Sequence, residues 1–194
     1  MNILYCGDKP MQKGILLSSM SLIGNVEEPL NIYILTVDYS EKGVNYNPVD
    51  KAFAKYLERK LNKSDIGVNV FLVDVTRYFV EELPEANMQS RFTACCMLRL
   101  FADKTDIKER VLYLDTDVLC RKDFSDFYYQ NMDGIEIAGV SDYYGRWLFG
   151  DGYINSGVML MNMKAIRENG ILEKCREQCI RKEMFMPDQT AINT

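Results

Sequence analysis

The sequence predicts an α/β fold with a mixed, mostly parallel sheet flanked by helices. Short apolar runs with the composition of buried strands alternate with segments of helical periodicity. Acidic residues follow directly after two of the strand-like runs, at the carboxyl ends where α/β sheets bind ligands. Because no repeat, low-complexity segment or linker interrupts this order, we expect residues 1–194 to form a single domain.

The N-terminal half supplies three strands and two helices. The strands are predicted from their apolar, β-branched composition at Asn2–Cys6, Asn31–Val37 and Val68–Val75. Pro10–Ile23 is predicted to be a helix because Pro10 suits its first turn and Gly24 suits the position after its last. A second helix opens at Asn47–Pro48, and its apolar residues recur on one face: Val49, Phe53, Tyr56, Leu57 and Leu61.

The C-terminal half continues the alternation. Strands are predicted at Val111–Leu114, Ile135–Val140 and Gly157–Met161. Helices are predicted at Ser90–Ala102, around Phe124–Tyr129, at Ile171–Glu183 and from Asp188 onward. The buried side of the Ser90–Ala102 helix is expected to carry Phe92, Cys95, Cys96 and Leu100.

Composition and charge exclude several classes of protein. A hydrophobic content of 47% with 26% charged residues is typical of a soluble globular domain. The net charge of −5, with Lys and Arg dispersed among acids, argues against a nucleic acid partner. No apolar run reaches transmembrane length, and the first residues are typical of a strand and not of a signal peptide. The absence of histidine excludes Ser-His-Asp and Cys-His catalysis within the chain.

The cysteines indicate a reducing compartment. They are Cys6, Cys95, Cys96, Cys120, Cys175 and Cys179. None has the C-x-x-C spacing of a zinc site, and most lie within apolar stretches. We therefore expect reduced, mostly buried thiols in a cytoplasmic protein. The sequence leaves open whether the chain forms a homo-oligomer.

The candidate metal site is the motif D-T-D within the run Arg110–Cys120. Asp115 and Asp117 follow an apolar strand, and residues i and i+2 of an extended chain point to one side, roughly 6.6 Å apart. Two close carboxylates beside apolar residues repel each other and are costly to remove from water. Mg²⁺ or Mn²⁺ would remove both problems and share its remaining positions with phosphate oxygens. The alternative is a strand end with two solvated aspartates that start a turn.

Five segments together resemble glycosyltransferase family 8. In chain order they are M-N-I-L-Y-C-G-D, M-L-R-L-F-A-D-K, R-V-L-Y-L-D-T-D-V-L, Y-I-N-S-G-V-M-L-M-N-M and P-D-Q-T-A-I-N. The family comprises retaining enzymes of GT-A fold, including bacterial lipopolysaccharide glucosyl- and galactosyltransferases and glycogenin. The resemblance implies Mn²⁺-dependent (or Mg²⁺-dependent) transfer of glucose or galactose from a UDP-sugar to a saccharide or lipopolysaccharide-type acceptor.

The resemblance also implies roles for the matching residues. Asp8, with the backbone near Tyr5 and Cys6, would contact uracil, and Arg99 would reach the donor sugar or diphosphate. The residues implied to hold the metal and the ribose side of the donor are Asp115, Thr116 and Asp117. The residues implied to surround the donor sugar are Asp142, Asn155 and Ser156, and those implied to border the reacting carbon are Asp188 and Gln189.

One departure from the family concerns the metal. The resemblance implies a third metal ligand, a histidine in a later segment, followed by a lysine near the diphosphate. This chain has no histidine and stops at Thr194, just inside the helix expected from Asp188. We therefore expect a C-terminally incomplete catalytic domain, either a truncated form or a shortened family member with a weakened site.

Each implied role also has a plain structural explanation. Asp8 can stabilise the N-terminus of the helix that follows it, and Arg99 can form an exposed helix pair with Asp103. For three further residues the explanation is local: a turn before Gly157 for Asn155, an exposed strand end for Asp142, and an N-cap after Pro187 for Asp188.

Two further functions compete with the transferase hypothesis. One is a nucleotide-sugar-binding remnant with little turnover. The second is a haloacid-dehalogenase-type phosphatase, which also ends a strand in D-x-D and has a late acidic motif that Gly150–Asn155 superficially matches. Such phosphatases place their first aspartate after the first strand, whereas three predicted strands precede Asp115 here.

Overall fold

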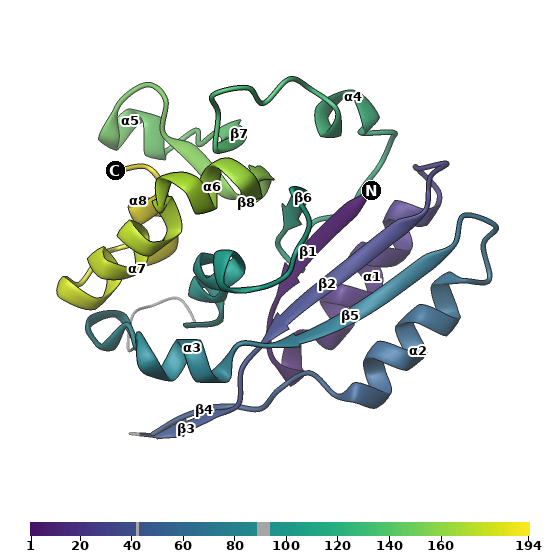
Figure 1. The fold of residues 1–194 in the computed structure, drawn as a ribbon, viewed down its shortest axis with the longest axis horizontal. Coiled ribbons are helices and arrows are strands. Elements are labelled where there is room, and N and C mark those ends of the chain that lie inside the picture. Colours follow the sequence, from purple (N-terminus) through teal and green to yellow (C-terminus); the bar gives the residue numbers. More distant parts are fainter. Residues whose placement is uncertain (42, 89–93) are drawn as a thin grey trace.

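A six-stranded sheet forms the centre of the computed structural model, which describes residues 1–41, 43–88 and 94–194 (Figure 1). The strands follow the order β5-β2-β1-β6-β8-β7. Their bounds are β1 Asn2–Cys6, β2 Leu30–Thr36, β5 Val68–Asp74, β6 Arg110–Leu114, β7 Ile137–Ser141 and β8 Ile154–Asn162. Strands β5, β2, β1 and β6 pair in parallel, whereas β8 runs antiparallel to both β6 and β7. The predicted α/β fold with a mixed, mostly parallel sheet is thus confirmed.

Helices cover both faces of the sheet because successive strand residues point to opposite sides. Leu4 and Cys6 of β1 join the core on one face, and Ile3 and Tyr5 join the core on the other. The first face packs against α3 (Thr76–Glu81), the 3₁₀ helix η3 (Ala94–Lys104), α6 (Met163–Asn169), α7 (Ile171–Arg181) and α8 (Pro187–Ile192). The second packs against α1 (Gln12–Ile23), α2 (Lys51–Leu61) and α4 (Ser125–Tyr128).

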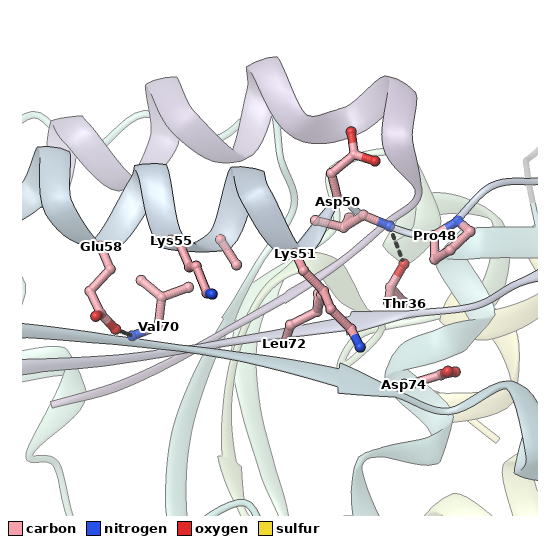
Figure 2. Close-up of a pocket in the computed structure, with 11 residues that line it drawn as sticks. Thr36, Pro48, Asp50, Lys51, Lys55, Glu58, Val70, Leu72 and Asp74 are labelled. Carbon is pink, nitrogen blue, oxygen red and sulfur yellow. Dashed lines mark hydrogen bonds between the residues drawn. The ribbon is translucent and has the colours of Figure 1, made fainter.

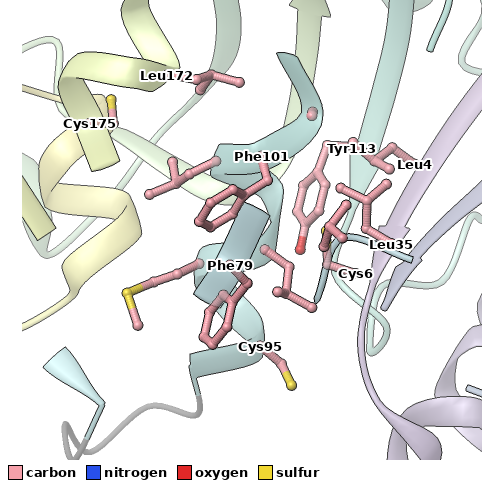
Figure 3. Packing of buried hydrophobic residues seen from close by; sticks show 14 of the residues in the cluster. Leu4, Cys6, Leu35, Phe79, Cys95, Phe101, Tyr113, Leu172 and Cys175 are labelled. Carbon is pink, nitrogen blue, oxygen red and sulfur yellow. The ribbon is translucent and has the colours of Figure 1, made fainter. Parts of the chain in front are cut away.

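The core of the first face is rich in aromatic and sulfur-containing side chains (Figure 3). The rings of Phe79 and Phe101 lie 5.8 Å apart and join α3 to η3. Tyr113 of β6 and Cys6 of β1 lie on the sheet side of this cluster, and Cys175 of α7 lies on its helix side (Figure 3). These contacts fix η3 against the sheet.

Several small elements are not predicted by the sequence patterns. They are the 3₁₀ helices η1 (Lys9–Met11) and η2 (Glu85–Asn87), the strand pair β3 (Tyr39–Glu41) and β4 (Val44–Tyr46), and the helices α3, α5 (Gly145–Phe149) and α6. Each is seven residues or shorter, which is about two helical turns at most, so none displays enough of a period for its sequence pattern to identify it.

Some predicted boundaries need correction. The helix expected from Asn47–Pro48 begins at Lys51, and its Tyr56 is 41% exposed instead of lying on the buried face. Gly24 ends α1 with an ordinary right-handed φ of −81°, so it does not adopt the left-handed cap conformation. The last strand begins earlier than expected, at Ile154 and not at Gly157, because Ile154 still pairs with Ser141 of β7, beyond a register shift between Gly139 and Ser141.

The helix expected at Ser90–Ala102 is only partly within the described residues. Positions 90–93, including Phe92, lie outside them, and the described part is a 3₁₀ helix that continues to Lys104. A 3₁₀ helix aligns residues i and i+3, which places Arg99 directly over Cys96. The tighter winding thus determines where the guanidinium of Arg99 leaves the helix.

No helix among residues 1–41, 43–88 and 94–194 is both long and apolar enough to cross a lipid bilayer.

Candidate functional site

The D-T-D motif forms a turn that follows β6. The strand ends at Leu114, and the backbone N–H of Val118 donates to the carbonyl of Asp115 at 3.1 Å, which closes a four-residue turn. The extended geometry expected for Asp115 and Asp117 is therefore wrong. Asp117 is exposed, whereas the side chain of Asp115 is 38% exposed and turned toward the protein.

Gly14 supports this turn, although sequence reasoning missed it. A Cβ atom at Gly14 would lie 2.6 Å from the carbonyl oxygen of Thr116, closer than real Cβ contacts come. The absence of a side chain on α1 therefore lets the turn pack against the helix. The one signal in the sequence was a glycine inside a helical pattern, which can indicate that another segment packs closely against the helix.

Arg99 lies at the centre of the site with 3% of its surface exposed. Its guanidinium donates to Asp115 Oδ1 at 2.9 Å and forms an ion pair of 3.3 Å with Asp188 Oδ2. It also donates to the carbonyl of Ser156 at 2.5 Å. The proposed pairing of Arg99 with Asp103 is wrong, because the buried guanidinium points into the site instead of along the helix surface.

Tyr113 completes the surroundings of this guanidinium. Its ring lies beneath Arg99, 4.1 Å from centroid to guanidinium carbon, and its hydroxyl donates to Asp115 Oδ1 at 2.6 Å. Burial acts to lower the pKa of Arg99, but electrostatic interactions with Tyr113, Asp188 and Asp115 raise it overall. Arg99 is therefore a fixed cation, and Tyr113 is a site residue that the sequence reasoning missed.

Asp188 and Gln189 are both 5% exposed and both contact Ser156. The backbone N–H of Ser156 donates to Gln189 Oε1 at 3.0 Å, and the Ser156 hydroxyl donates to Asp188 Oδ2 at 3.1 Å. Asp188 lies in the first turn of α8, and Met186 takes the N-cap position, so the N-cap role considered for Asp188 is wrong. These contacts join the start of β8 to α8.

Asp142 accepts a hydrogen bond from the NH₂ group of the Gln189 amide, whose oxygen accepts from Ser156. Its Oδ2 accepts from Asn155 Nδ2 at 2.9 Å and from Gln189 Nε2 at 3.3 Å, and its Oδ1 accepts from the backbone N–H of Gly145 at 2.6 Å. The hydrogen bond from Asn155 is the main reason that the pKa of Asp142 is lowered, followed by that from Gly145. The local explanations for this pair were partly right: Asp142 follows β7, and Asn155 Oδ1 does accept from Gly157 N at 2.9 Å.

Asp8 and Cys6 lie where β1 ends, beside the end of β6. The register pairs Ile3 with Leu112 and Leu4 with Tyr113, so the chain leaves both strands at the same edge of the sheet, as expected. Asp8 is 8% exposed, and its buried Oδ1 has no hydrogen-bond partner among the described residues. Burial raises the pKa of Asp8, and the backbone of Asp8 and Met11 at the start of η1 opposes that rise, so stabilisation of this helix end remains a second role for the carboxylate.

The donor atoms near the turn suit a hard cation that keeps ligands from outside the protein. Arg99 and Tyr113 both use Oδ1 of Asp115, and the described residues leave its Oδ2 without a hydrogen-bond donor. Asp117 adds an exposed carboxylate. No group of three or more His, Cys, Asp or Glu side chains gathers among the described residues in a metal-binding arrangement. The oxygen donors present fit Mg²⁺ or Mn²⁺ with phosphate or water in the other positions.

A cavity of about 570 Å³ lies away from these residues, between α2 and the edge strand β5 (Figure 2). Lys51, Lys55 and Glu58 line it from α2, and Val70, Leu72 and Asp74 line it from β5 (Figure 2). None of the predicted site residues lines this cavity. This cavity and the charged network around Arg99 therefore mark different parts of the molecule.

Comparison with known families gives one match over almost the whole chain. The sequence model described as glycosyl transferase family 8 matches residues 2–194. Among curated proteins, the probable glycosyl transferase Gly of Streptococcus gordonii is 27% identical over 71% of this chain and 19% of its own length. The lipopolysaccharide 1,2-glucosyltransferase of Escherichia coli is 22% identical over 99% of this chain and 57% of its own length. The chain thus spans about a fifth of the length of the first relative and little more than half of the length of the second.

Solved structures of the same fold include the galactosyltransferase LgtC and the glycosyltransferase GlyE. An active-site variant of LgtC superposes with a TM-score of 0.79 at 18% identity and covers 100% of this chain and 70% of that one. GlyE of Streptococcus pneumoniae superposes with a TM-score of 0.71 at 20% identity over 99% of this chain and 42% of that one. At these identities the likeness establishes the fold.

Proposed function

The chain belongs to glycosyltransferase family 8, and from this premise we propose that it transfers glucose or galactose from a UDP-sugar to a saccharide acceptor with retention of configuration. One observation carries the proposal: the buried Arg99 contacts Asp115, on the proposed diphosphate side, and Asp188, on the proposed sugar side. A single fixed cation would thus lie between the sugar and the diphosphate, the two groups whose bond breaks.

We propose that the nucleotide binds at the ends of β1 and β6. The orphaned, buried Oδ1 of Asp8 is the atom we assign to uracil, because a buried acceptor without a donor is costly until a ligand supplies one. Cys6 and Thr116 would contact the donor beside it. Asp115 and Asp117 would hold Mn²⁺ or Mg²⁺, which when bound would stabilise the leaving diphosphate as a Lewis acid.

The sugar residues are assigned from the network around β8. The bond between the anomeric carbon and a diphosphate oxygen breaks, and positive charge develops on the sugar. Asp188 is a buried carboxylate that can offset this charge, and Asp142 and Asn155 can bind sugar hydroxyls. Gln189 is held by Ser156 and Asp142, and because an amide is a poor nucleophile we assign it to orientation of the sugar and not to covalent attack.

The acceptor and the cellular location of the protein are inferred from a relative and from the cysteines. A relative is named as a lipopolysaccharide glucosyltransferase, which supports a saccharide or lipopolysaccharide-type acceptor for this chain. The described cysteines are mostly buried thiols, which supports a cytoplasmic location, where UDP-sugar donors would be met. The phosphatase considered from the sequence is wrong, because the family match spans residues 2–194.

The test is donor turnover. The full chain is incubated with UDP-glucose or UDP-galactose and Mn²⁺, and UDP release is measured, with the anomeric configuration of any product read by NMR. Asp188→Asn should lower UDP release at least tenfold, because it removes the carboxylate charge that is proposed to offset the developing cation. Asp133→Asn, an exposed aspartate elsewhere, is the control. Unchanged turnover in Asp188→Asn would contradict the assignment.

A second candidate is a binding protein with little turnover. The observation that favours it is the small donor set around Asp115 and Asp117, which brings no third His, Cys, Asp or Glu side chain from the described residues. Tight UDP-sugar binding without UDP release would select this candidate over the transferase.

A further inference from the structure

The segment Tyr143–Phe149 exposes an unusual concentration of large apolar side chains. The exposed fractions are 70% for Tyr143, 77% for Tyr144, 88% for Trp147, 66% for Leu148 and 54% for Phe149. A hollow of about 590 Å³ is lined by Tyr143, Tyr144, Arg146, Trp147 and Leu148. We call these five residues the aromatic platform. Scattered exposed apolar residues are ordinary, but a contiguous group of this kind marks an interaction surface.

The segment Tyr143–Phe149, which carries the platform, is fixed to the rest of the fold near both of its ends. At its start, Asp142 accepts the backbone N–H of Gly145, and a Cβ atom at Gly145 would lie 2.3 Å from the ring of Tyr153. At its end, Phe149 stacks on Tyr153 with ring centroids 4.8 Å apart. The hydroxyl of Tyr153 in turn lies 3.2 Å from that of Thr190 in α8. The side chains are therefore presented on an anchored helix, α5, beside β8 (Figure 1).

The platform is continuous with the proposed donor-sugar site through one carboxylate. Asp142 Oδ1 holds the N-terminus of α5, and Asp142 Oδ2 accepts from Asn155 and Gln189. A molecule on the platform would thus lie next to the sugar that these residues are proposed to orient. This adjacency is where an acceptor must lie for its hydroxyl to reach the donor sugar.

Resting on the proposed transferase function, we propose that the aromatic platform binds the saccharide acceptor. The C–H groups on one side of a pyranose ring are apolar and slightly positive, and they suit the negative face of an aromatic ring. The hydroxyls of Tyr143 and Tyr144 and the guanidinium of Arg146 supply polar groups for the sugar's edges, with Arg146 held 5.3 Å from the centroid of the Tyr143 ring.

Charge favours a saccharide over a lipid surface. A helix that docks on anionic membrane carries a basic rim, but the platform has Arg146 flanked by Asp142 and Asp151. The near balance of charge around the aromatic side chains suits an uncharged polyhydroxyl ligand.

The experiment uses the chain's only tryptophan, Trp147, as the reporter. The full chain is titrated with lactose, maltose and cellobiose, with and without UDP and Mn²⁺, while tryptophan fluorescence is recorded. A saturable change with at least one of these saccharides is expected. Tyr144→Ala should weaken that binding about fivefold, the scale of one lost aromatic contact. No saccharide-dependent change in any titration would overturn the proposal.

The control variant is Tyr129→Ala, because Tyr129 is 54% exposed but contacts Glu28, which precedes β2 at the end of the sheet where β1 and β6 begin. It should bind saccharides like the unchanged chain. UDP affinity, measured separately by calorimetry, should be the same in Tyr144→Ala and the unchanged chain. If the unchanged chain does not bind UDP, the proposed function is wrong. If it binds UDP but its fluorescence does not respond to any saccharide, only the proposed role of the aromatic platform is wrong.

Sedimentation distinguishes self-association. If the chain is dimeric and Tyr144→Ala or Trp147→Ala makes it monomeric, the platform is an interface between copies and the acceptor proposal fails. Binding of the unchanged chain to anionic vesicles that is lost in the same variants would overturn it equally.

Discussion

The carbonyl of Gly157 accepts the backbone N–H of Asp115 at 2.8 Å, and a Cβ atom added to Gly157 would lie only 2.9 Å from Asp115 Oδ2. The glycine thus leaves open the carboxylate oxygen that no described donor occupies. Its place in the N-S-G-V segment was known from the sequence, but this contact was not.

Gly157→Ala should therefore weaken metal-dependent UDP binding while the protein stays folded. The added methyl must displace the Asp115 carboxylate, and changes beside a metal ligand typically reduce affinity about 10–100-fold. Calorimetry with UDP and Mn²⁺ measures the effect. Gly24→Ala is the matched control, because a Cβ atom there meets nothing within 4 Å. Equal affinities in the two variants would contradict the role given to Asp115 Oδ2.

Asp117→Asn should lose most of the tightening of UDP binding by Mn²⁺. Cation and diphosphate neutralise each other at the turn, and an amide replaces one of the two proposed carboxylate ligands. Because Asp117 is exposed, thermal stability should not change. UDP affinity is compared with Mn²⁺ and with chelator, using Asp126→Asn as the control. If the unchanged chain binds UDP equally in both conditions, the metal assignment is wrong.

Asp8→Asn should stabilise the free protein at pH 7 and impair recognition of uracil. Burial raises the pKa of Asp8, so the folded protein holds this proton more tightly than the unfolded chain. The resulting stability is present below the unfolded pKa and is lost as pH rises through the folded value. Melting curves at acidic and neutral pH should show the unchanged chain losing stability relative to Asp8→Asn as pH increases.

The same residue predicts base selectivity. An unmatched buried polar group costs about 1–3 kcal/mol, so UDP should outcompete GDP by at least about tenfold in the unchanged chain. Competition calorimetry measures the ratio, which should fall in Asp8→Asn. Equal competition by GDP in the unchanged chain would exclude Asp8 as the base-reading residue.

Arg99→Met should destabilise the fold by about 3–5 kcal/mol, because it leaves the buried carboxylate of Asp188 without its cation. Arg99→Lys keeps the charge but cannot reach Asp115, Asp188 and the Ser156 carbonyl together, so it should fold better than Arg99→Met and still lose donor turnover. Urea unfolding and UDP release provide the two readouts.

Arg77→Met is the control for this pair of variants. Arg77 forms an ion pair with Glu81 on the exposed surface of α3, so its loss should leave unfolding unchanged. Similar unfolding curves for Arg99→Met and Arg77→Met would show that the buried network contributes nothing special to stability.

The long elements could be predicted because their signals are local. Strands β1, β2, β5 and β6 each carry a continuous run of four apolar residues, and α7 shows a helical period. Helix α6 was missed because it follows β8 directly, with no Gly or Pro between them, and its seven residues form only about two turns. The three-residue strands β3 and β4 were missed because they are stabilised by pairing with each other and not by a sequence period.

The sequence named most of the candidate residues, but it did not predict the contacts between them. The edge rule for parallel strands places Asp8 and Asp115 together from sequence order alone. The contact of Arg99 with both Asp115 and Asp188 depends on the winding of η3 and the docking of α8, which no local pattern encodes. For the same reason Tyr113 and Gly14 could not be recognised: their roles arise only where two elements meet.

The antiparallel direction of β8 determines which loop beside the donor site can vary in sequence and so change the choice of acceptor. Nine residues of strand span roughly 30 Å, so a parallel β8 would carry Asn155 and Ser156 to the far edge of the sheet. Because β8 runs the other way, the chain that enters it, from α5 to Gly152, opens onto the same rim as the chain that leaves β1 and β6. Variation in that entering segment can therefore change what meets the donor while leaving the nucleotide end of the rim untouched.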